Sequence, residues 1–444
     1  MKKIFSTILI LSTVLSITSC KYEEDDIWDQ SAAERIETIM KNYGNVLESS
    51  KGGWAMEYYP TNKEEFIIGQ GYLITAKFSQ DNTVETAMKN IFSANTYLED
   101  VSTWDITRDQ GPVLSFSSYN NCIHVFADPY DLAFTIGDTS AADEEGKGAQ
   151  GDYEFVMVDF PQDAETTMLK GKKRGTYVRM TRLADDTDPK TYIEDCQAFT
   201  KKMFGLRNPL ELSYTVGGDT YSVDKLNTGL VTCYPQGTDS VIERIKEPYL
   251  ITKRNDSYYL RFRNKLTGGS ATQEFVYDAE NDIFKSTTAD DVFLMYPNIV
   301  SNIIKHAMEN KSWRLMRNAT SRMSAKMASL MSGLYKAIPQ FSYMEFRYYG
   351  GAFFITLKYS VEADFSYKVE TNEENNTFKL TFESPGQDYA KSRYDATPAM
   401  QALLGALSQE FKVTKVGDTM YNMDAVRFTS TTDEDLWFEL SIQL

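Results

Sequence analysis

The sequence predicts an α+β protein of two domains, built mainly from antiparallel β-sheets in a meander, sandwich or barrel-like arrangement, with a few packed helices. The chain has 444 residues, enough for more than one core. Its 25 phenylalanines, 28 tyrosines and 5 tryptophans favour strands. Short stretches of alternating apolar residues recur along it. With 42% apolar and 25% charged residues, the composition is that of a folded protein.

The first element, residues 1–19, is predicted to be a lipoprotein signal peptide. Two lysines precede an apolar run from Ile4 to Ile17 that is too short to span a membrane. The sequence ITSC at 17–20 resembles a bacterial lipobox, so Cys20 is the predicted site of lipidation and the first residue of the mature chain. Several acyl chains on this residue would hold the protein on a membrane almost permanently.

Residues 20–30 are predicted to be an acidic tether. The run KYEEDD that follows Cys20 carries four carboxylates, so it is not expected to pack and stays solvated. In the Bacteroidota, acidic residues just after the lipidated cysteine resemble the signal for the outer face of the outer membrane, so we expect a lipid-anchored protein facing the cell exterior. Loss of the two lysines in the signal peptide changes the net charge from −17 to −19. Such an acidic chain lacks the cationic face of a nucleic-acid-binding protein.

Residues 31–185 are predicted to form an N-terminal domain, a helix followed by a β-meander. SAAE at 31–34 is a capping box, and apolar residues follow at helical spacing until Gly52-Gly53. Alternation then predicts strands around 54–58 and 72–78, and at Val113–Phe116, Ile123–Ala127, Tyr153–Phe160 and Thr176–Leu183. Six basic residues lie in the last hairpin: Lys170, Lys172, Lys173, Arg174, Arg179 and Arg182. They could pair with the protein's own acids, which we favour, or bind an anionic ligand.

A linker helix is predicted within 186–209, at Thr191–Phe204, followed by a C-terminal α+β domain over 210–444. This domain is expected to begin with strands over 210–296. Helices are then predicted at Ile299–Met308 and Ser312–Ile338, the second with a methionine-rich apolar stripe that faces the core. Further strands follow, interrupted by a helix at 398–411 with Thr397 as its N-cap and Pro398 at its first position. A last strand runs to Leu444.

The ionisable side chains give no catalytic or metal-binding constellation, and no cofactor is predicted. The two histidines, His124 and His306, lie far apart in sequence, and His124 is expected to be a packed residue. Cys122, Cys196 and Cys233 match no zinc signature. They are expected to be buried, although one disulfide among them is conceivable.

Three weaker patterns resemble parts of catalytic or metal sites. Ser222 and Lys225 fit the S-x-x-K spacing of a serine nucleophile, but alternation places them on a strand, so we treat the match as chance. Carboxylate pairs such as Asp290-Asp291 and Glu144-Glu145 could serve a glycoside hydrolase only if they faced each other across a cleft. The acidic loop Asp138–Asp152 is the best calcium candidate, yet it lacks EF-hand spacing.

Four stretches carry a family resemblance: DDIWDQSAAERI from Asp25, GGWAMEYYP at 52–60, GPVLSFSSYN at 111–120, and GDYEFVMVDF with LKGKKRG within 151–175. Over roughly the first 200 residues the chain resembles a Bacteroidota lipoprotein family, domain of unknown function number 4302. The resemblance transfers no site residues. It implies an accessory role beside outer-membrane receptors for nutrient uptake.

The leading functional hypothesis is a non-enzymatic surface lipoprotein that binds a glycan or a peptide, because aromatic side chains offer surfaces for such ligands. Its expected partners are the membrane, through Cys20, and outer-membrane receptor or transport proteins. The alternatives are a carboxylate-dependent hydrolase and a structural subunit of an outer-membrane transport complex.

Overall fold

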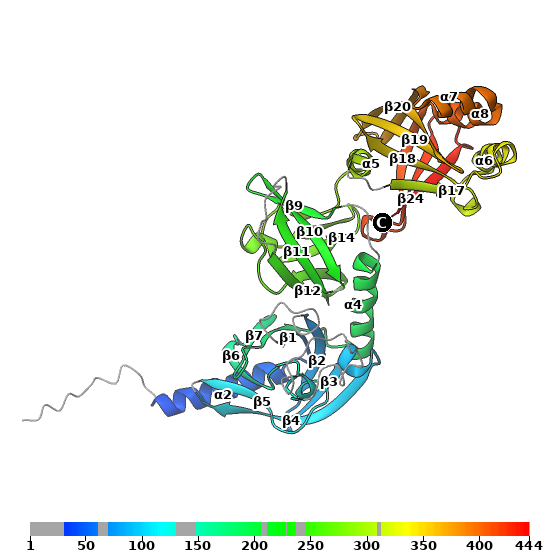
Figure 1. The fold of residues 1–444 in the computed structure, drawn as a ribbon. Helices are drawn as coiled ribbons and strands as arrows, with labels where there is room; N and C mark the ends of the chain where they lie inside the picture. The colour runs from blue at the N-terminus through cyan, green and yellow to red at the C-terminus, as the bar shows by residue number, and fades with distance from the viewer. Residues whose placement is uncertain are drawn as a thin grey trace, which may run out of the picture.

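The computed structural model describes residues 31–60, 70–109, 111–129, 148–205, 211–227, 229–236, 245–308 and 312–443. They form three consecutive β units, seen along the chain in Figure 1: a closed eight-stranded barrel (unit 1, 54–182), an eight-stranded sheet (unit 2, 213–294) and a second closed eight-stranded barrel (unit 3, 312–443). The mainly antiparallel, barrel-like β fold is therefore confirmed. The division into two domains is not, because residues 210–444 contain two separate sheets.

Unit 1 begins with α2 (Ala32–Glu48), which confirms the helix and its capping box: Ser31 and Glu34 each accept a backbone N–H from the other. A Cβ at Gly52 would lie 1.8 Å from the carbonyl oxygen of Ala184, and Gly53 has a φ of +81°, so both glycines are needed at the entrance to the barrel. The elements that follow are β1 (Trp54–Tyr59), β2 (Tyr72–Phe78), β3 (Thr83–Met88), η1 (Ile91–Ser93), β4 (Leu98–Arg108), β5 (Pro112–Phe116), η2 (His124–Phe126), β6 (Glu154–Asp159), β7 (Thr166–Gly171) and β8 (Tyr177–Arg182).

Both faces of β1 are covered. Trp54, Met56 and Tyr58 belong to the barrel core, while Ala55 packs with residues of the next helix, α4 (Pro189–Phe204). Every residue of β1 is buried, as is typical of strands covered on both sides.

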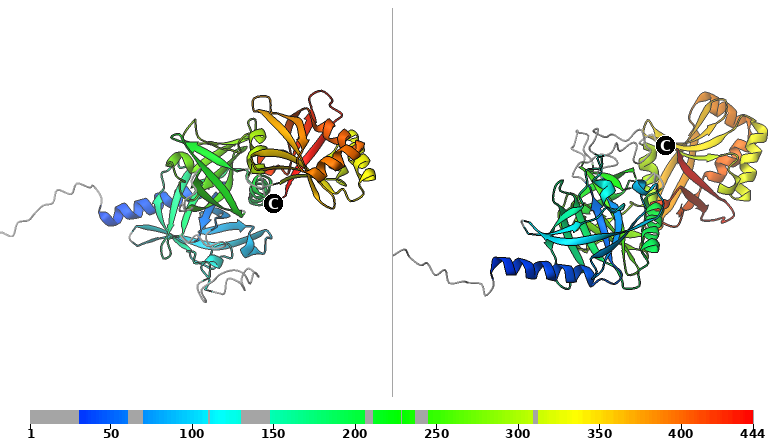
Figure 2. Two further views of the ribbon diagram at one scale, coloured as in Figure 1. Left: turned by 45° about the horizontal axis from the view of Figure 1, so that its top comes forward. Right: turned by 90° about the horizontal axis from the view of Figure 1, so that it is seen from below.

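α4 confirms the predicted linker helix and joins two cores. Asp188 accepts the N–H of Thr191 at 2.8 Å and caps the helix, and Pro189 occupies its first position. The first half of α4 packs on unit 1, while Met203 and Phe204 at its end belong to the core of unit 2. Figures 1 and 2 show the helix running beside both units.

Unit 2 confirms the predicted β segment at 210–296. Its elements are β9 (Ser213–Val216), β10 (Asp219–Asn227), β11 (Leu230–Pro235), β12 (Ile245–Arg254), β13 (Ser257–Phe262), η3 (Ser270–Thr272), β14 (Glu274–Asp278), β15 (Ile283–Ser286) and β16 (Phe293–Leu294). The two end strands meet, because Ser213 and Met295 exchange two backbone hydrogen bonds of 3.0 Å. Tyr421 of unit 3 enters the core of this unit, and its hydroxyl donates to the carbonyl of Leu294 at 2.7 Å.

Unit 3 closes through pairing of its first strand with its last. Its elements, with the helix that precedes it, are α5 (Ile299–Met308), β17 (Ser312–Met316), η4 (Thr320–Arg322), α6 (Ala325–Ala337), β18 (Tyr343–Tyr349), β19 (Ala352–Lys358), β20 (Glu362–Asn372), β21 (Thr377–Pro385), α7 (Asp388–Ala396), α8 (Pro398–Leu407), β22 (Glu410–Val416), η5 (Met420–Asn422), β23 (Ala425–Ser430) and β24 (Trp437–Gln443).

The helix predicted at 398–411 ends earlier, at Leu407, because β22 begins at Glu410. Two further elements differ in type from their predictions. The predicted helix at Ser312–Ile338 is wrong in its first part, where β17 places Trp313 and Leu315 in the barrel core and α6 starts only at Ala325. The predicted strand at Ile123–Ala127 is also wrong: the carbonyl of Asn120 accepts the N–H groups of residues 123 and 124, and the chain turns into η2. Of the helices in the described residues, none is long and apolar enough to cross a membrane.

Candidate functional site

Units 1 and 2 are joined by a buried group of charges, which we call the interface ion cluster. The Arg179 guanidinium lies 2.8 Å from the Glu57 carboxylate in unit 1 and 3.1 Å from the Glu274 carboxylate in unit 2. The Glu274 carboxylate also forms ion pairs with the guanidinium groups of Arg254, at 2.6 Å, and Arg261, at 3.6 Å. Burial alone would lower the pKa of Arg179, but the two carboxylates outweigh it and raise this pKa.

Gly71 lies at a contact between the two units. A Cβ on Gly71 would lie 2.5 Å from the ring of Tyr59 and 2.8 Å from Leu250 of unit 2. Any larger residue would push the units apart, so backbone contact and ion cluster together fix their relative position.

Beside this contact lies the first of three hollows, which we call the apolar cleft, of about 530 Å³. It is bounded by β2, the η1 turn, α4 and β12. Its buried residues are mainly apolar: Tyr72, Leu73, Cys196, Tyr249 and Ile251. Less buried polar side chains also line it: Gln70, Lys89, Asn90, Asn95, Gln197, Thr200 and Lys201.

Two polar side chains of the apolar cleft, those of Asn90 and Thr200, form hydrogen bonds with the backbone. Asn90 caps η1 by accepting the N–H of Phe92 at 2.9 Å, and the Thr200 hydroxyl donates to the carbonyl of Cys196 at 2.7 Å. Burial raises the pKa of the Cys196 thiol to about 12, so this cysteine is protonated and a poor nucleophile. The cleft has the size, the apolar lining and the few polar groups of a ligand-binding site at a domain boundary.

The second hollow, the acidic cleft, has a volume of about 890 Å³ and lies where α4 begins, against the turn between β12 and β13. Its carboxylates are Glu165, Asp185, Asp186, Asp188, Asp195 and Asp256. Its three cations are fewer than its six carboxylates, and each is already engaged: Lys253 pairs with Asp195 within the cleft at 2.9 Å, Arg254 pairs with Glu274 outside it, and Arg182 lies 4.6 Å from the ring of Trp54. This cleft is therefore electronegative. Hydrogen bonds from Thr191 lower the pKa of Asp188, opposite to the shift of a general acid.

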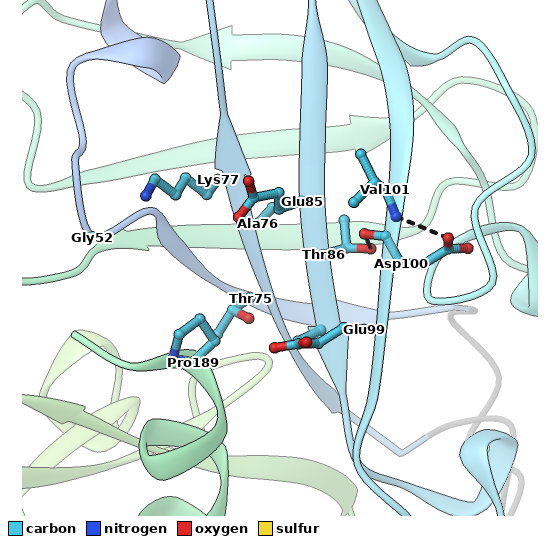
Figure 3. Close-up of a pocket in the computed structure, with 11 residues that line it drawn as sticks. Gly52, Thr75, Ala76, Lys77, Glu85, Thr86, Glu99, Asp100, Val101 and Pro189 are labelled. Atoms are coloured by element: carbon cyan, nitrogen blue, oxygen red, sulfur yellow. Dashed lines mark hydrogen bonds between the residues drawn. The ribbon is translucent and has the colours of Figure 1, made fainter.

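A third hollow, on the outer face of β2, β3 and β4, is shown in Figure 3. Lys77 and Glu85 are partners across β2 and β3, with Glu99 and Asp100 on β4. Hydrogen bonds from Asn121 and Val101 outweigh burial and lower the pKa of Asp100. At about 190 Å³ this hollow is too small for a typical organic ligand.

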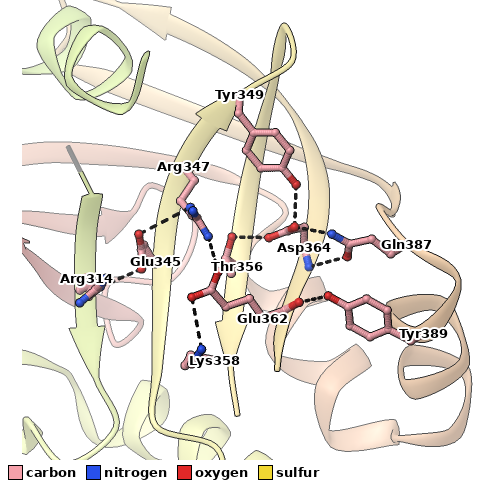
Figure 4. A network of polar contacts seen from close by, with 10 residues as sticks. All are labelled: Arg314, Glu345, Arg347, Tyr349, Thr356, Lys358, Glu362, Asp364, Gln387 and Tyr389. Atoms are coloured by element: carbon pink, nitrogen blue, oxygen red, sulfur yellow. Dashed lines mark hydrogen bonds and ion pairs between the residues drawn. The ribbon is translucent and has the colours of Figure 1, made fainter. Parts of the chain in front are cut away.

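The outer face of unit 3 carries the polar network of Figure 4. Three carboxylates approach one another on β18 and β20. Glu345 accepts from Arg314 at 2.7 Å, Glu362 accepts from Arg347 at 2.7 Å, and Asp364 accepts the hydroxyls of Tyr349 and Thr356, each at 2.6 Å. Arg347 holds the pKa of Glu362 below its usual value. Because these carboxylates are matched by donors, the network braces the barrel wall.

Several sequence predictions fall on residues that the structure does not describe. The signal peptide, the lipidation site Cys20 and the tether lie outside the described residues, as do Glu144-Glu145 and residues 138–147 of the calcium candidate loop. The end of that loop is described: the Asp152 carboxylate accepts the N–H groups of Lys173, Arg174 and Thr176 and so fastens the basic hairpin. The described residues contain no group of three His, Cys, Asp or Glu that could hold a metal.

The remaining candidates are packed or solvated. Cys122, Cys196 and Cys233 are free and buried, as favoured from the sequence. Ser222 lies on β10 and donates to Glu211, whereas the side chain of Lys225 is outside the described set, as is that of His306 on α5. Asp290-Asp291 is exposed in the connection before β16 and lines none of the clefts above.

The basic hairpin is confirmed as β7 and β8, and it pairs with the protein's own acids. Lys172 lies 3.1 Å from Asp109 and 3.5 Å from Glu154, and Arg179 belongs to the interface ion cluster. No local sequence pattern indicates the apolar cleft, since Gln70, Thr200 and Ile251 are far apart in the chain. The charged Glu57 between Met56 and Tyr58 was a visible signal of a second buried face on β1.

Comparison with solved structures gives no usable relative. A DNA polymerase III β chain from Streptococcus pneumoniae TIGR4 is 8% identical, with 92% of this chain and 98% of that chain covered and a TM-score of 0.13. For the β subunit from Thermotoga maritima the identity is 7%, the coverage 91% and 96%, and the TM-score 0.11. TM-scores this low carry no argument about fold or function.

No curated protein matches the chain. A family model does match, over residues 24–279, which is more than half of the sequence and includes unit 1, α4 and most of unit 2. The chain therefore belongs to the family described as "Domain of unknown function (DUF4302)".

Proposed function

We propose that this protein is a lipid-anchored protein of the outer-membrane surface that binds a glycan or a peptide without transforming it, and that the apolar cleft is its binding site. The observation that carries the proposal is the cleft itself: an apolar hollow of about 530 Å³ between two units, with amide and hydroxyl side chains around it. The lipobox-like sequence at Cys20 supports the membrane anchor.

The chemistry of the described side chains favours binding over hydrolysis. A glycosidase needs one carboxyl group with a raised pKa beside one that is ionised. Among the described residues, no carboxylate lines the apolar cleft, and in the acidic cleft the pKa of Asp188 is lowered. Burial raises the pKa of Glu48, but this residue ends α2 and lines neither cleft.

The rigidity of the site also supports recognition. The ion cluster and the Gly71 contact fix unit 1 against unit 2, so the cleft exists before a ligand arrives. A preformed site avoids the cost of ordering side chains on binding.

The test is a glycan and peptide array probed with residues 31–444, which contain every described element. The variant Thr200→Trp places an indole in the cleft, and the matched control Ala198→Trp adds the same group at an exposed position of α4. We expect the wild type and Ala198→Trp to bind the same ligand and Thr200→Trp to bind it at least about tenfold more weakly. Equal binding by all three would exclude the apolar cleft as the site. Turnover of the bound ligand would favour the hydrolase, and binding of no ligand the structural subunit.

A further inference from the structure

We propose that an exposed stack of three rings on unit 1, formed by Tyr119, His124 and Tyr153, is a binding site for a neutral saccharide. This site is separate from the apolar cleft and does not depend on it. Tyr119 follows β5, His124 opens η2, and Tyr153 directly precedes β6. The pairing of β5 with β6 therefore brings the three rings to one end of this strand pair.

The ring of His124 stacks on that of Tyr153 and is tilted against that of Tyr119. The ring of His124 lies 4.5 Å from that of Tyr153, with 20° between their planes, and 5.1 Å from that of Tyr119, with 32° between their planes. Tyr119 is 54% exposed and Tyr153 is 41% exposed. Single exposed aromatic residues are ordinary, but a contiguous exposed stack is the kind of apolar patch that marks a binding surface.

The stack is fixed from below. Asn120 is fully buried, and its side chain bonds to Thr86 and Ser102 at 3.0 Å each. Its backbone N–H donates to Nδ1 of His124 at 3.1 Å, and the Tyr119 hydroxyl donates to Asp128 at 2.6 Å. The rings are therefore held in place before any ligand binds, which lowers the entropic cost of binding.

The polar groups of the stack select the ligand class. Burial lowers the pKa of His124, and because Nδ1 accepts a hydrogen bond, the neutral ring carries its proton on Nε2 as a donor. The carboxylate of Asp128 is an acceptor and disfavours anionic ligands. Ser117, Ser118 and Asn121, next to the stack in sequence, are exposed hydroxyl and amide groups.

The arrangement of the rings differs from an aromatic cage for a cation. Such cages for quaternary ammonium groups enclose the charge among several aromatic faces, whereas the rings of His124 and Tyr153 stack on each other. A flat aromatic face bordered by hydroxyl, amide and carboxylate groups complements a sugar ring, which has an apolar C–H face and hydroxyl groups at its edge. These rings line none of the three hollows described above.

The position of the stack leaves it accessible. In the closed barrel, β5 lies across from β1, the strand that faces unit 2 through Glu57 and α4 through Ala55. The stack and the apolar cleft therefore share no residue.

The experiment is affinity electrophoresis of the full chain through gels that contain amylose, dextran, mannan, xylan or mixed-linkage β-glucan. We expect at least one of these neutral polysaccharides to retard the wild type. Tyr119→Ala and Tyr153→Ala should weaken that interaction about tenfold, while Tyr119→Phe, which keeps the ring, should stay within about threefold of wild type. Tyr349→Ala is the matched control, because Tyr349 is a stacked tyrosine with 42% exposure on unit 3.

The outcomes separate this proposal from the cleft proposal. Thr200→Trp should leave polysaccharide binding by the stack unchanged, even if it abolishes binding in the cleft. Retardation by none of the five polysaccharides would overturn the saccharide site, as would equal retardation of the wild type and Tyr119→Ala. A direct check uses a His306→Gln variant, in which His124 is the single imidazole. The NMR signal of the His124 ring must shift when an oligosaccharide of the polysaccharide that retarded the protein is added. It must not shift when tetramethylammonium is added.

Discussion

Replacing Arg179 with methionine should loosen unit 1 from unit 2, because Arg179 is the cation that both units share. Glu57 is 0% exposed, and its Oε1 lies 2.8 Å from Arg179. Its other oxygen is buried and makes no hydrogen bond within the described residues. The substitution would leave this carboxylate buried without its counter-charge.

The expected magnitude follows from that burial. Removing one partner of a buried ion pair costs about 3–5 kcal/mol, whereas replacing both partners by apolar residues is often nearly neutral. Glu274 would keep Arg254 at 2.6 Å in either variant. We therefore expect a loss of about 3–5 kcal/mol for Arg179→Met but less than about 2 kcal/mol for the double variant Glu57→Leu with Arg179→Met.

The assay is native-state hydrogen exchange, read on peptides that cover β1 and β8. Arg179→Met should speed the exchange of these amides about 100-fold or more, and the double variant should restore most of the protection. A loss below about 1 kcal/mol in the single variant would refute the reasoning, as would effects of Glu57→Leu and Arg179→Met that simply add.

Three further predictions concern the anchor, the thiols and the junction with unit 3. Wild-type protein should incorporate labelled palmitate and Cys20→Ala should not; equal labelling would disprove the anchor. Burial raises the pKa of Cys122 to about 11 and that of Cys196 to about 12, so both thiols should resist iodoacetamide at pH 8 until the protein unfolds, and mass spectrometry would detect premature labelling. Their contribution to stability is present below about pH 9 and is lost as the pH rises through these values. Tyr421→Ala should destabilise β16 by about 3–5 kcal/mol, as measured by hydrogen exchange, because the Tyr421 ring is fully buried in unit 2. The control Tyr335→Ala should cost under about 1 kcal/mol, because Tyr335 is exposed. Equal effects of the two substitutions would contradict this role of Tyr421.

Local features of the fold could be predicted from the sequence. The capping box depends on Ser31 and Glu34, three positions apart, so the sequence displays it directly. The predicted strands that became β1, β2, β5, β6 and β8 also show their inward faces through alternation.

The errors arose where two periods fit the same residues. Leu315, Ala319 and Met323 are spaced like one face of a helix, yet Trp313 and Leu315 also alternate as a strand, and closure of the barrel by β17 decides for the strand. At residues 123–127 the apolar run is too short to distinguish a strand from a turn of helix.

Features that join distant parts of the chain could not be predicted. Units 2 and 3 are not joined by a polar linker. Instead, apolar residues of α5 pack on the core of unit 3, and Tyr421 of unit 3 packs in the core of unit 2. The apolar cleft and the ring stack likewise combine residues separated by tens to hundreds of positions. Their existence depends on strand order and on the contact between units, which no local pattern encodes.

The most direct test of the proposed function maps the bound ligand on the unmodified protein. Hydrogen exchange of residues 31–444 is measured with and without the strongest ligand found on the array. We predict added protection in three of the segments that line the apolar cleft, namely η1, residues 196–201 of α4 and residues 249–251 of β12. Protection confined to the acidic cleft, or none in these three segments, would contradict the account.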